Sequence, residues 1–293
     1  MRLPALLVCL AVSLSMPAGC ESGQSGSQVL HQERSQYQEI YVVEGGGRRC
    51  LQFARTRSVQ SCLDLDDPLA LQMPYTRAMM VGLLARPQPS RVLMIGLGGA
   101  SIPRALQALD PSMRIDVAEL DPVIVRIAES YFRLQRDARM QVFVEDGRAF
   151  VERRQRAGAQ YDLVLLDAFD AEYIPEHLLT VEFLRSVQAI LAPDGAVVAN
   201  TFRSRSRSAR ETATYRAVFA DLYQVAAGGN RILLAGAPLA SMDRMRANAQ
   251  LLERPLKRFG VSALSLVDEL EPVPETDARP FTDRRSSDGT PPR

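Results

Sequence analysis

The chain has 293 residues, of which 46% are hydrophobic and 24% are charged, enough apolar material for one main globular domain with a smaller attachment. It carries 35 lysine and arginine residues against 34 aspartate and glutamate residues, so no net field favours nucleic acid or an anionic surface. The basic segment "RSRSRSAR", residues 203–210, has no interleaved aromatic residue, so we expect a solvated loop and no nucleic-acid partner.

Residues 1–19 have the layout of a signal peptide, with a positive charge at Arg2, an apolar stretch and small residues before Cys20. The apolar stretch is too short for a membrane-spanning helix. The letters "PAGC" are similar to a bacterial lipobox, although Pro17 stands where leucine is usual. We expect a lipoprotein of the cell envelope lipidated at Cys20, with membrane contact only through this signal or lipid. A cleaved periplasmic protein, an uncleaved anchor, and a cytoplasmic protein without a signal are the alternatives.

Two short segments are expected between the signal and the main domain. Residues 20–34, rich in serine, glycine and glutamine, predict a flexible tether. Residues 35–72 alternate apolar and polar character around the turn "EGGGRR", which predicts a small antiparallel β unit.

The cysteines form a pair once the N-terminal ones are set aside. Cys9 lies in the signal and Cys20 at the lipidation site, which leaves Cys50 and Cys62 in two strand-like segments of the β unit. In an oxidising compartment this pair predicts a disulfide, and two buried free thiols are the alternative. The spacing of cysteines and histidines does not match a metal site, so we expect no metal.

Residues 73–270 are expected to form the nucleoside-binding catalytic domain. A helical pattern over 74–84 precedes the strands "RVLMIGL", "RIDVAEL", "MQVFVED", "YDLVLLDA" and "DGAVVANTF", which alternate with helical segments, the last of them near 211–222. Strands nearly continuous in valine, isoleucine and leucine predict a parallel sheet covered on both faces. Residues 241–259 predict a helix interrupted by Pro255, and residues 271–293 a polar, partly disordered tail.

Polar residues follow the first three strands at their carboxyl ends, where ligands bind in open α/β sheets. The loop "GLGGAS", residues 96–101, permits a tight turn and close approach of a ligand to the backbone. Glu119 is placed to accept hydrogen bonds from ribose hydroxyls, and Asp146 in "EDG" from an adenine amino group. The joint pattern predicts a nucleoside site. A nicotinamide site fits less well, because Ser101 breaks the G-x-G-x-x-G spacing.

The fourth buried strand ends in acids, in the stretch "YDLVLLDAFDAEYIPEHLLT". Asp167 follows its apolar run directly, and Asp170 comes three residues later. An amine that is protonated at neutral pH cannot attack a carbon, so carboxylates at the floor of a pocket can hold the cation and then accept its proton. A helix or turn cap is the alternative role for Asp167.

At these residues the sequence resembles the spermidine synthase family, within the class I S-adenosylmethionine-dependent methyltransferase fold. The resemblance spans about residues 36–234 and is carried by "SQYQEIYVVE", "SVQSCLDLDDP", "RVLMIGLGGASIPRAL" and "LLDAFD", the last similar to the family's Asp-Ser-Ser-Asp-Pro motif. It implies an α/β fold, a Rossmann-like and mostly parallel sheet with helices on both faces, preceded by a small antiparallel β unit.

The resemblance implies residue roles and a reaction. Asp167 would be the base that receives the amine's proton, Asp170 would help to hold the cationic substrate, and Gln60 would line the substrate side. The reaction would be aminopropyl transfer from decarboxylated S-adenosylmethionine to a small amine in polyamine biosynthesis. The enzyme would be a monomer or a homodimer. The implied cofactor-binding residues are Gln38, Gly96, Gly98, Gly99, Glu119, Asp146 and Gly147.

The sequence also departs from the family, mostly on the amine side. Gly99 stands where the family's glycine loop has an acid, residues 71–74 ("LQMP") supply no carboxylate, and Ala171 replaces a proline. Export would also separate the enzyme from a cytoplasmic cosubstrate. Two alternatives therefore stay open: a methyltransferase that uses S-adenosylmethionine on a small molecule, and a non-catalytic, envelope-tethered module that binds a polyamine or a nucleoside.

Overall fold

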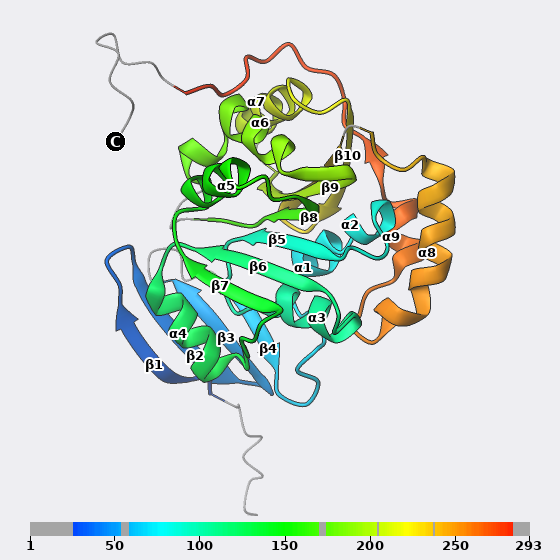
Figure 1. Cartoon of the computed structure of the whole chain (residues 1–293). Helices are drawn as coiled ribbons and strands as arrows, with labels where there is room; N and C mark the ends of the chain where they lie inside the picture. Colours follow the sequence, from blue (N-terminus) through cyan, green and yellow to red (C-terminus); the bar gives the residue numbers. More distant parts are fainter. Residues whose placement is uncertain (1–25, 54–58, 170–173, 204, 237, 284–293) are drawn as a thin grey trace, which may run out of the picture.

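The protein is described from a computed structural model that covers residues 26–53, 59–169, 174–203, 205–236 and 238–283. It contains two sheets and ten helical segments within these ranges (Figure 1). The smaller sheet has four antiparallel strands in sequence order: β1 (Gln28–Arg34), β2 (Glu39–Gly45), β3 (Arg48–Phe53) and β4 (Val59–Asp64). The small β unit predicted over residues 35–72 is present, and β1, which precedes residue 35, adds one strand to it.

The extra strand corrects the expected tether over residues 20–34. Residues 28–34 form β1, paired with β2 from Val29 opposite Val43 to Arg34 opposite Glu39. On the other side, Glu33 Oε1 accepts a hydrogen bond from Arg126 of helix α4 at 2.5 Å. Backbone pairing with β2 orders a segment whose polar composition alone suggested a flexible linker.

A disulfide joins the two cysteines of the small sheet. Cys50 on β3 and Cys62 on β4 are directly opposed in the antiparallel ladder, and their sulfur atoms are bonded. The bond links neighbouring strands of the small sheet, and β4 then leads to the first helices.

The large sheet has eight strands, in the spatial order β12-β10-β11-β9-β8-β5-β6-β7. The pairs among β5 to β9 are all parallel, whereas β11, β10 and β12 add antiparallel strands at one edge. Strand order reverses at β5, because β6 lies on one side of it and β8 on the other, and such a point opens a crevice at the carboxyl ends. The bounds are β5 (Arg91–Ile95), β6 (Arg114–Glu119), β7 (Met140–Val144), β8 (Tyr161–Leu166), β9 (Leu191–Phe202), β10 (Asp221–Ala227), β11 (Asn230–Gly236) and β12 (Glu271–Pro272).

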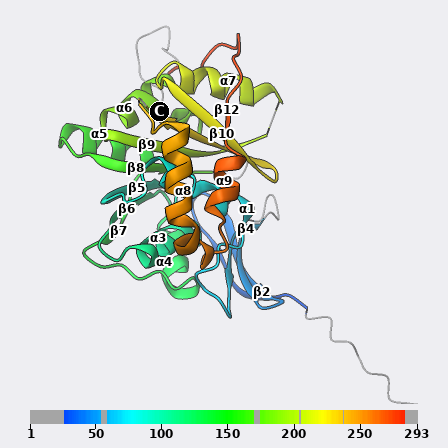
Figure 2. The same cartoon turned by 90° about the vertical axis from the view of Figure 1, so that its right-hand side faces the viewer.

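Helices cover both faces of the large sheet (Figures 1 and 2). Alternate residues of one strand enter different cores: in β5, Val92 and Met94 pack in one core, and Leu93 and Ile95 in the other. The first core includes the small sheet with α1 (Pro74–Met79), α2 (Gly82–Ala85), α3 (Ser101–Leu109), α4 (Pro122–Tyr131), α8 (Met242–Lys257) and α9 (Ala263–Asp268). The second includes α5 (Gly147–Arg156), the short 3₁₀ helix η1 (Glu176–Leu178), α6 (Val181–Ala189) and α7 (Arg205–Arg216).

Several helix boundaries differ from the prediction. The helix expected over 74–84 is two short helices, α1 and α2. Helix α7 begins at Arg205, inside the basic segment expected to be a loop, and ends at Arg216. Pro255 does not interrupt α8: it lies in the last turn, and the helix continues to Lys257.

The C-terminal region is packed through Asp283. We expected a polar tail from residue 271, but β12 pairs with β10, and residues 273–283 run over α7 and α6, as the red segment of Figure 1 shows. Within the described residues, no helix is long and apolar enough to cross a membrane.

Candidate functional site

A cavity of about 400 Å³ lies at the carboxyl ends of β5, β6 and β8, beside the reversal of strand order. One wall comes from the loops that follow these strands. The opposite wall comes from the small sheet, through Gln38, Phe53 and Gln60. A volume of this size suits a nucleoside-sized ligand, since small-molecule sites typically have about 300–1,000 Å³.

The glycine loop after β5 brings the backbone to the edge of the cavity. Gly96 has a φ of +93°, and a Cβ there would lie 2.3 Å from the Asp167 carbonyl oxygen, so only glycine fits. Gly98 also lines the cavity. Gly99 instead packs inward, where an added Cβ would lie 2.6 Å from Ser61 Oγ and 3.1 Å from the Phe132 ring.

Glu119 ends β6 and ties the glycine loop to the next helix. Its Oε2 accepts a hydrogen bond from the Leu97 backbone N–H, and its Oε1 one from Asp121, each at 2.9 Å. Burial raises the pKa of Glu119, and these hydrogen bonds offset part of that rise. The carboxylate lines the cavity, where its remaining lone pairs can accept hydrogen bonds from a ligand.

Asp146 caps helix α5 and pairs with a histidine at the cavity rim. Its Oδ1 accepts hydrogen bonds from the backbone N–H groups of Arg148 and Ala149, both at 3.0 Å. Its Oδ2 lies 2.8 Å from Nε2 of His177, on η1. Burial acts to raise the pKa of Asp146, but His177 and the two N–H groups outweigh it and hold the pKa below its usual value. Gly147, beside it, is buried and also lines the cavity.

Asp167 directly follows β8 and lines the cavity. Its Oδ1 accepts a hydrogen bond from Asn200 Nδ2 at 2.9 Å, and Asn200 Oδ1 accepts one from Asn230 Nδ2, also at 2.9 Å. Burial raises the pKa of Asp167 to about 7, although the Asn200 hydrogen bond acts in the opposite direction. The nearby Tyr75 hydroxyl donates to the Gln60 carbonyl oxygen at 3.0 Å, and burial together with Asp167 keeps the pKa of Tyr75 well above its usual value.

Two oxygen atoms at the cavity have no hydrogen-bond partner among the described residues. They are Oε1 of Gln38 and Oδ2 of Asp121, both buried. Buried acceptors are rarely left unpaired, so each calls for a hydroxyl or amino donor that a ligand can provide. The donors of a nucleoside therefore fit the atoms present. No group of three or more His, Cys, Asp or Glu side chains suited to a metal ion occurs among the described residues.

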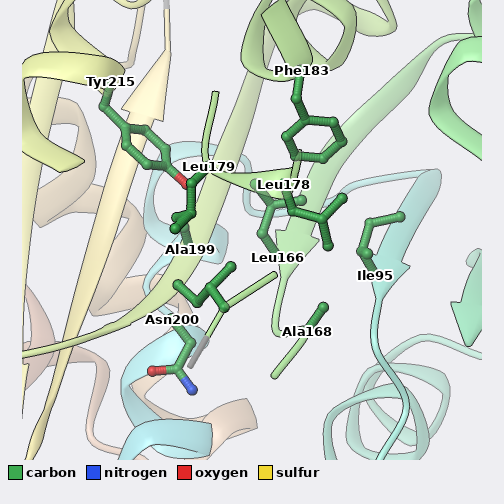
Figure 3. A pocket seen from close by; sticks show the side chains of 10 residues that line it. Ile95, Leu166, Ala168, Leu178, Leu179, Phe183, Ala199, Asn200 and Tyr215 are labelled. Atoms are coloured by element: carbon green, nitrogen blue, oxygen red, sulfur yellow. The ribbon is translucent and has the colours of Figure 1, made fainter. Parts of the chain in front are cut away.

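A smaller cavity of about 20 Å³ lies beside Asn200 and is lined by residues of β8, β9 and α6 (Figure 3). It shares Ile95, Ala168, Leu178 and Asn200 with the large cavity, and Phe183 and Tyr215 close its far side. The space holds about one water molecule, and its lining is mostly apolar. Asn200, the hydrogen-bond partner of Asp167, also lines this space.

Comparison with known proteins decides the family. The sequence model of the spermine/spermidine synthase domain matches residues 73–220. The chain is 39% identical, over 264 residues and 87% of each protein, to the polyamine aminopropyltransferase of Vibrio vulnificus. The chain belongs to the spermine/spermidine synthase family. The predicted family and the predicted enzyme class, a transferase of polyamine biosynthesis, are thereby confirmed.

Solved structures confirm the predicted fold of this spermidine synthase family member. A probable spermidine synthase from Corynebacterium glutamicum superposes with a TM-score of 0.70 and 22% identity, over 89% of this chain and 98% of that one. Human methyltransferase-like protein 13 in complex with SAH superposes with a TM-score of 0.59 and 27% identity, over 63% of this chain and 92% of that one.

The cavity gathers most of the residues that the resemblance implied. Gln38, Gly96, Gly98, Glu119, Asp146, Gly147, Gln60 and Asp167 all line it, whereas Gly99 does not. Asp170 and Cys20 lie outside the described residues, so their roles stay predictions. Asn200, Asn230 and His177 also line the cavity and were not among the predicted site residues. Asn200 carried the same signal as the acids, a polar residue at the end of an apolar strand, "AVVAN".

Proposed function

We propose that this family member transfers an aminopropyl group from decarboxylated S-adenosylmethionine to a small amine, with Asp167 as the base. The observation that carries the proposal is the position of Asp167. It is a half-buried carboxyl group that lines a nucleoside-sized cavity, and its pKa of about 7 suits a base at neutral pH.

The donor nucleoside is held by residues at the ends of β6 and β7. Glu119 and the unpaired oxygen of Gln38 are suited to ribose hydroxyls, since both are acceptors at the cavity wall. Asp146 faces the adenine end, where Oδ2 can accept a second hydrogen bond beside the one from His177. When bound, the donor supplies a carbon made electrophilic by the adjacent sulfonium.

The acceptor amine lies between Asp167 and an aromatic wall. The rings of Phe169 and Phe202, whose centroids are 4.9 Å apart, line the cavity with Tyr75. Aromatic faces attract an ammonium group and leave its alkyl chain in apolar surroundings. Asp167 accepts the proton that the amine loses as the new C–N bond forms and the donor's C–S bond breaks, which leaves a neutral thioether.

A methyltransferase that uses S-adenosylmethionine is the second candidate. The resemblance to human methyltransferase-like protein 13, which was solved in complex with SAH, supports an adenosyl pocket of this kind. Residues 71–74, which supply no carboxylate on the amine side, favour the same alternative, because fewer described carboxylates are available to hold a diamine.

Product analysis separates the two candidates. The purified protein is incubated with either decarboxylated S-adenosylmethionine or S-adenosylmethionine and a panel of mono- and diamines, and the products are identified by mass spectrometry. We expect an aminopropylated amine and 5′-methylthioadenosine with the decarboxylated donor only. A methylated amine and S-adenosylhomocysteine would establish the second candidate instead.

Location in the cell envelope remains part of the proposal. It rests on the signal-like residues 1–19 and on Cys20, with the disulfide as support, because stable disulfides occur mainly in oxidising compartments. Cell fractionation with Cys20→Ala as the comparison tests it, and an intact N-terminus in the soluble cytoplasmic fraction would contradict it.

A further inference from the structure

The C-terminal strap, defined here as residues 273–283, is fixed along its whole length. At its start, the Val273 N–H donates to the Leu222 carbonyl oxygen at 3.1 Å, and Arg216 pairs with Glu275 at 3.1 Å. Further on, Arg210 lies 3.8 Å over the Phe281 ring. The strap therefore follows α7 toward α6, away from the small sheet (Figures 1 and 2).

The end of the strap completes the N-terminus of α6. The Val181 N–H, one of the first N–H groups of this helix, donates to the Phe281 carbonyl oxygen at 2.9 Å. The Asp283 N–H donates to Glu182 Oε2, also at 2.9 Å. The start of a helix has N–H groups without partners inside the helix, so the strap replaces water there.

Asp283 then makes a two-pronged ion pair with Arg148. The two nitrogens of the guanidinium lie 2.9 and 2.6 Å from the two carboxylate oxygens, and both side chains are mostly buried. The pair holds the pKa of Asp283 below its usual value. Paired hydrogen bonds of this kind fix orientation as well as charge.

Arg148 connects this ion pair to the rim of the large cavity. Its backbone N–H donates to Asp146 Oδ1 at 3.0 Å, and its side chain donates to the His177 carbonyl oxygen at 3.3 Å. Asp146 and His177 are themselves paired at 2.8 Å. One arginine, oriented by the last described residue of the strap, thus contacts both members of the pair at the adenine end.

We propose that Asp283 and Arg148 are positioning residues for the donor nucleoside: the strap holds η1 in place through Arg148, so that His177 stays on Asp146 and the adenine end of the cavity is preformed. This inference rests on the proposed function, because it assigns the Asp146 side of the cavity to the nucleoside. Without the ion pair, η1 has to be ordered when the donor binds, and donor affinity falls by that ordering cost.

The test measures binding of 5′-methylthioadenosine by calorimetry, together with steady-state kinetics, in the full-length protein. Asp283→Asn keeps the shape but removes the charge. We expect the dissociation constant of Asp283→Asn for 5′-methylthioadenosine to rise about three- to tenfold, as for the loss of a partly buried charge pair. The donor KM should rise by the same factor, with kcat and the acceptor KM unchanged.

Glu275→Gln is the matched control, because Glu275 anchors the same strap to Arg216 at a distance from the cavity. It should leave nucleoside affinity unchanged. Equal losses in Glu275→Gln and Asp283→Asn would mean that the strap only stabilises the fold, and would overturn the proposal. Should Asp283→Asn not fold, Arg148→Lys, which keeps the charge without the two-pronged geometry, takes its place.

The combined variant Arg148→Gln/Asp283→Asn shows whether the two residues act as a unit. If Arg148 and Asp283 act as a unit, the combined variant should bind 5′-methylthioadenosine no more weakly than the weaker-binding of the variants Arg148→Gln and Asp283→Asn. Wild-type affinity in Asp283→Asn, or a lowered kcat at unchanged affinity, would overturn the inference and leave the proposed function intact. A wild-type protein that binds no 5′-methylthioadenosine would overturn both.

Discussion

The side-chain amide of Asn200 donates a hydrogen bond to Asp167 across two neighbouring parallel strands, at 2.9 Å. The register explains the contact: Leu166 of β8 lies opposite Ala199 of β9, so the next residue of each strand emerges at the same edge. Asn230, on the antiparallel neighbour β11, donates to Asn200 Oδ1 and thereby fixes which way its amide points. Among the described residues, this contact holds Asp167 through its Oδ1.

We predict that Asn200→Ala shifts the pH dependence of the reaction. The Asn200 hydrogen bond opposes the effect of burial, so its loss should raise the pKa of Asp167 above about 7. Since the base must be deprotonated, the rise of kcat/KM with pH should move to higher pH. Asn230→Ala is the control, because Asn230 contacts Asn200 and should move the profile less. An unmoved profile in Asn200→Ala would contradict this account.

For the wild-type protein, kcat/KM for the acceptor should rise through about pH 7, as Asp167 loses its proton. Asp167→Asn should abolish this rise and lower kcat by about 10²–10⁴, the usual contribution of a general base. Its affinity for 5′-methylthioadenosine should stay the same. A variant that loses nucleoside binding along with turnover would instead assign Asp167 to donor positioning.

Asp167 should also make the fold less stable as pH rises. Its folded-state pKa of about 7 lies above its ordinary value, so the folded protein holds a proton that the unfolded chain releases at lower pH. The free energy of unfolding should therefore fall as the pH rises from about 4 to 7, by about 1.4 kcal/mol for each pH unit between the two pKa values. Asp167→Asn has no carboxyl group to titrate at this position, so its free energy of unfolding should fall by less. Urea unfolding of both proteins at pH 5 and 8 measures the difference, and equal changes with pH would contradict the prediction.

Much of the site could be predicted because it depends on local order along the chain. Glu119 ends an apolar strand, and Asp146 and Asp167 follow one within two residues; parallel strands bring their carboxyl ends to one edge of a sheet. The sequence pattern therefore predicted which residues meet in the cavity before any contact was known.

The parts that could not be predicted depend on which segments become neighbours. Asn200 reaches Asp167 only because β9 lies beside β8, and residues 28–34 form a strand only because β2 offers its edge. The packing of the strap likewise depends on Arg148 and Arg210, each more than 60 residues away in sequence. Composition and periodicity carry no information about such pairings.

We expect that replacing Gly99 by any residue with a side chain destabilises the protein. An added Cβ would lie 2.6 Å from Ser61 Oγ and 3.0 Å from Ser61 Cβ, so Gly99→Ala should lower the free energy of unfolding by about 1–3 kcal/mol. Gly229→Ala is the control, since nothing lies within 4 Å of its added Cβ. Ser61→Gly should recover part of the loss in Gly99→Ala. Wild-type stability in Gly99→Ala would show that this loop has room for the acid that other family members carry there.

The Cys50–Cys62 disulfide is expected to stabilise the protein without taking part in catalysis. The bond spans 12 residues, so restricting the unfolded chain should contribute about 2–3 kcal/mol to the free energy of unfolding. Urea unfolding of the oxidised protein and of Cys50→Ser/Cys62→Ser measures this difference, with kcat expected to stay the same because neither cysteine lines the cavity. Wild-type protein treated with a reductant is the control, and its unfolding curve should move onto that of the double variant. Coincident unfolding curves for oxidised and reduced wild-type protein would have one of two causes: the bond does not form in solution, or β3 and β4 stay paired in the unfolded chain. Counting the free thiols of the untreated protein decides between the two.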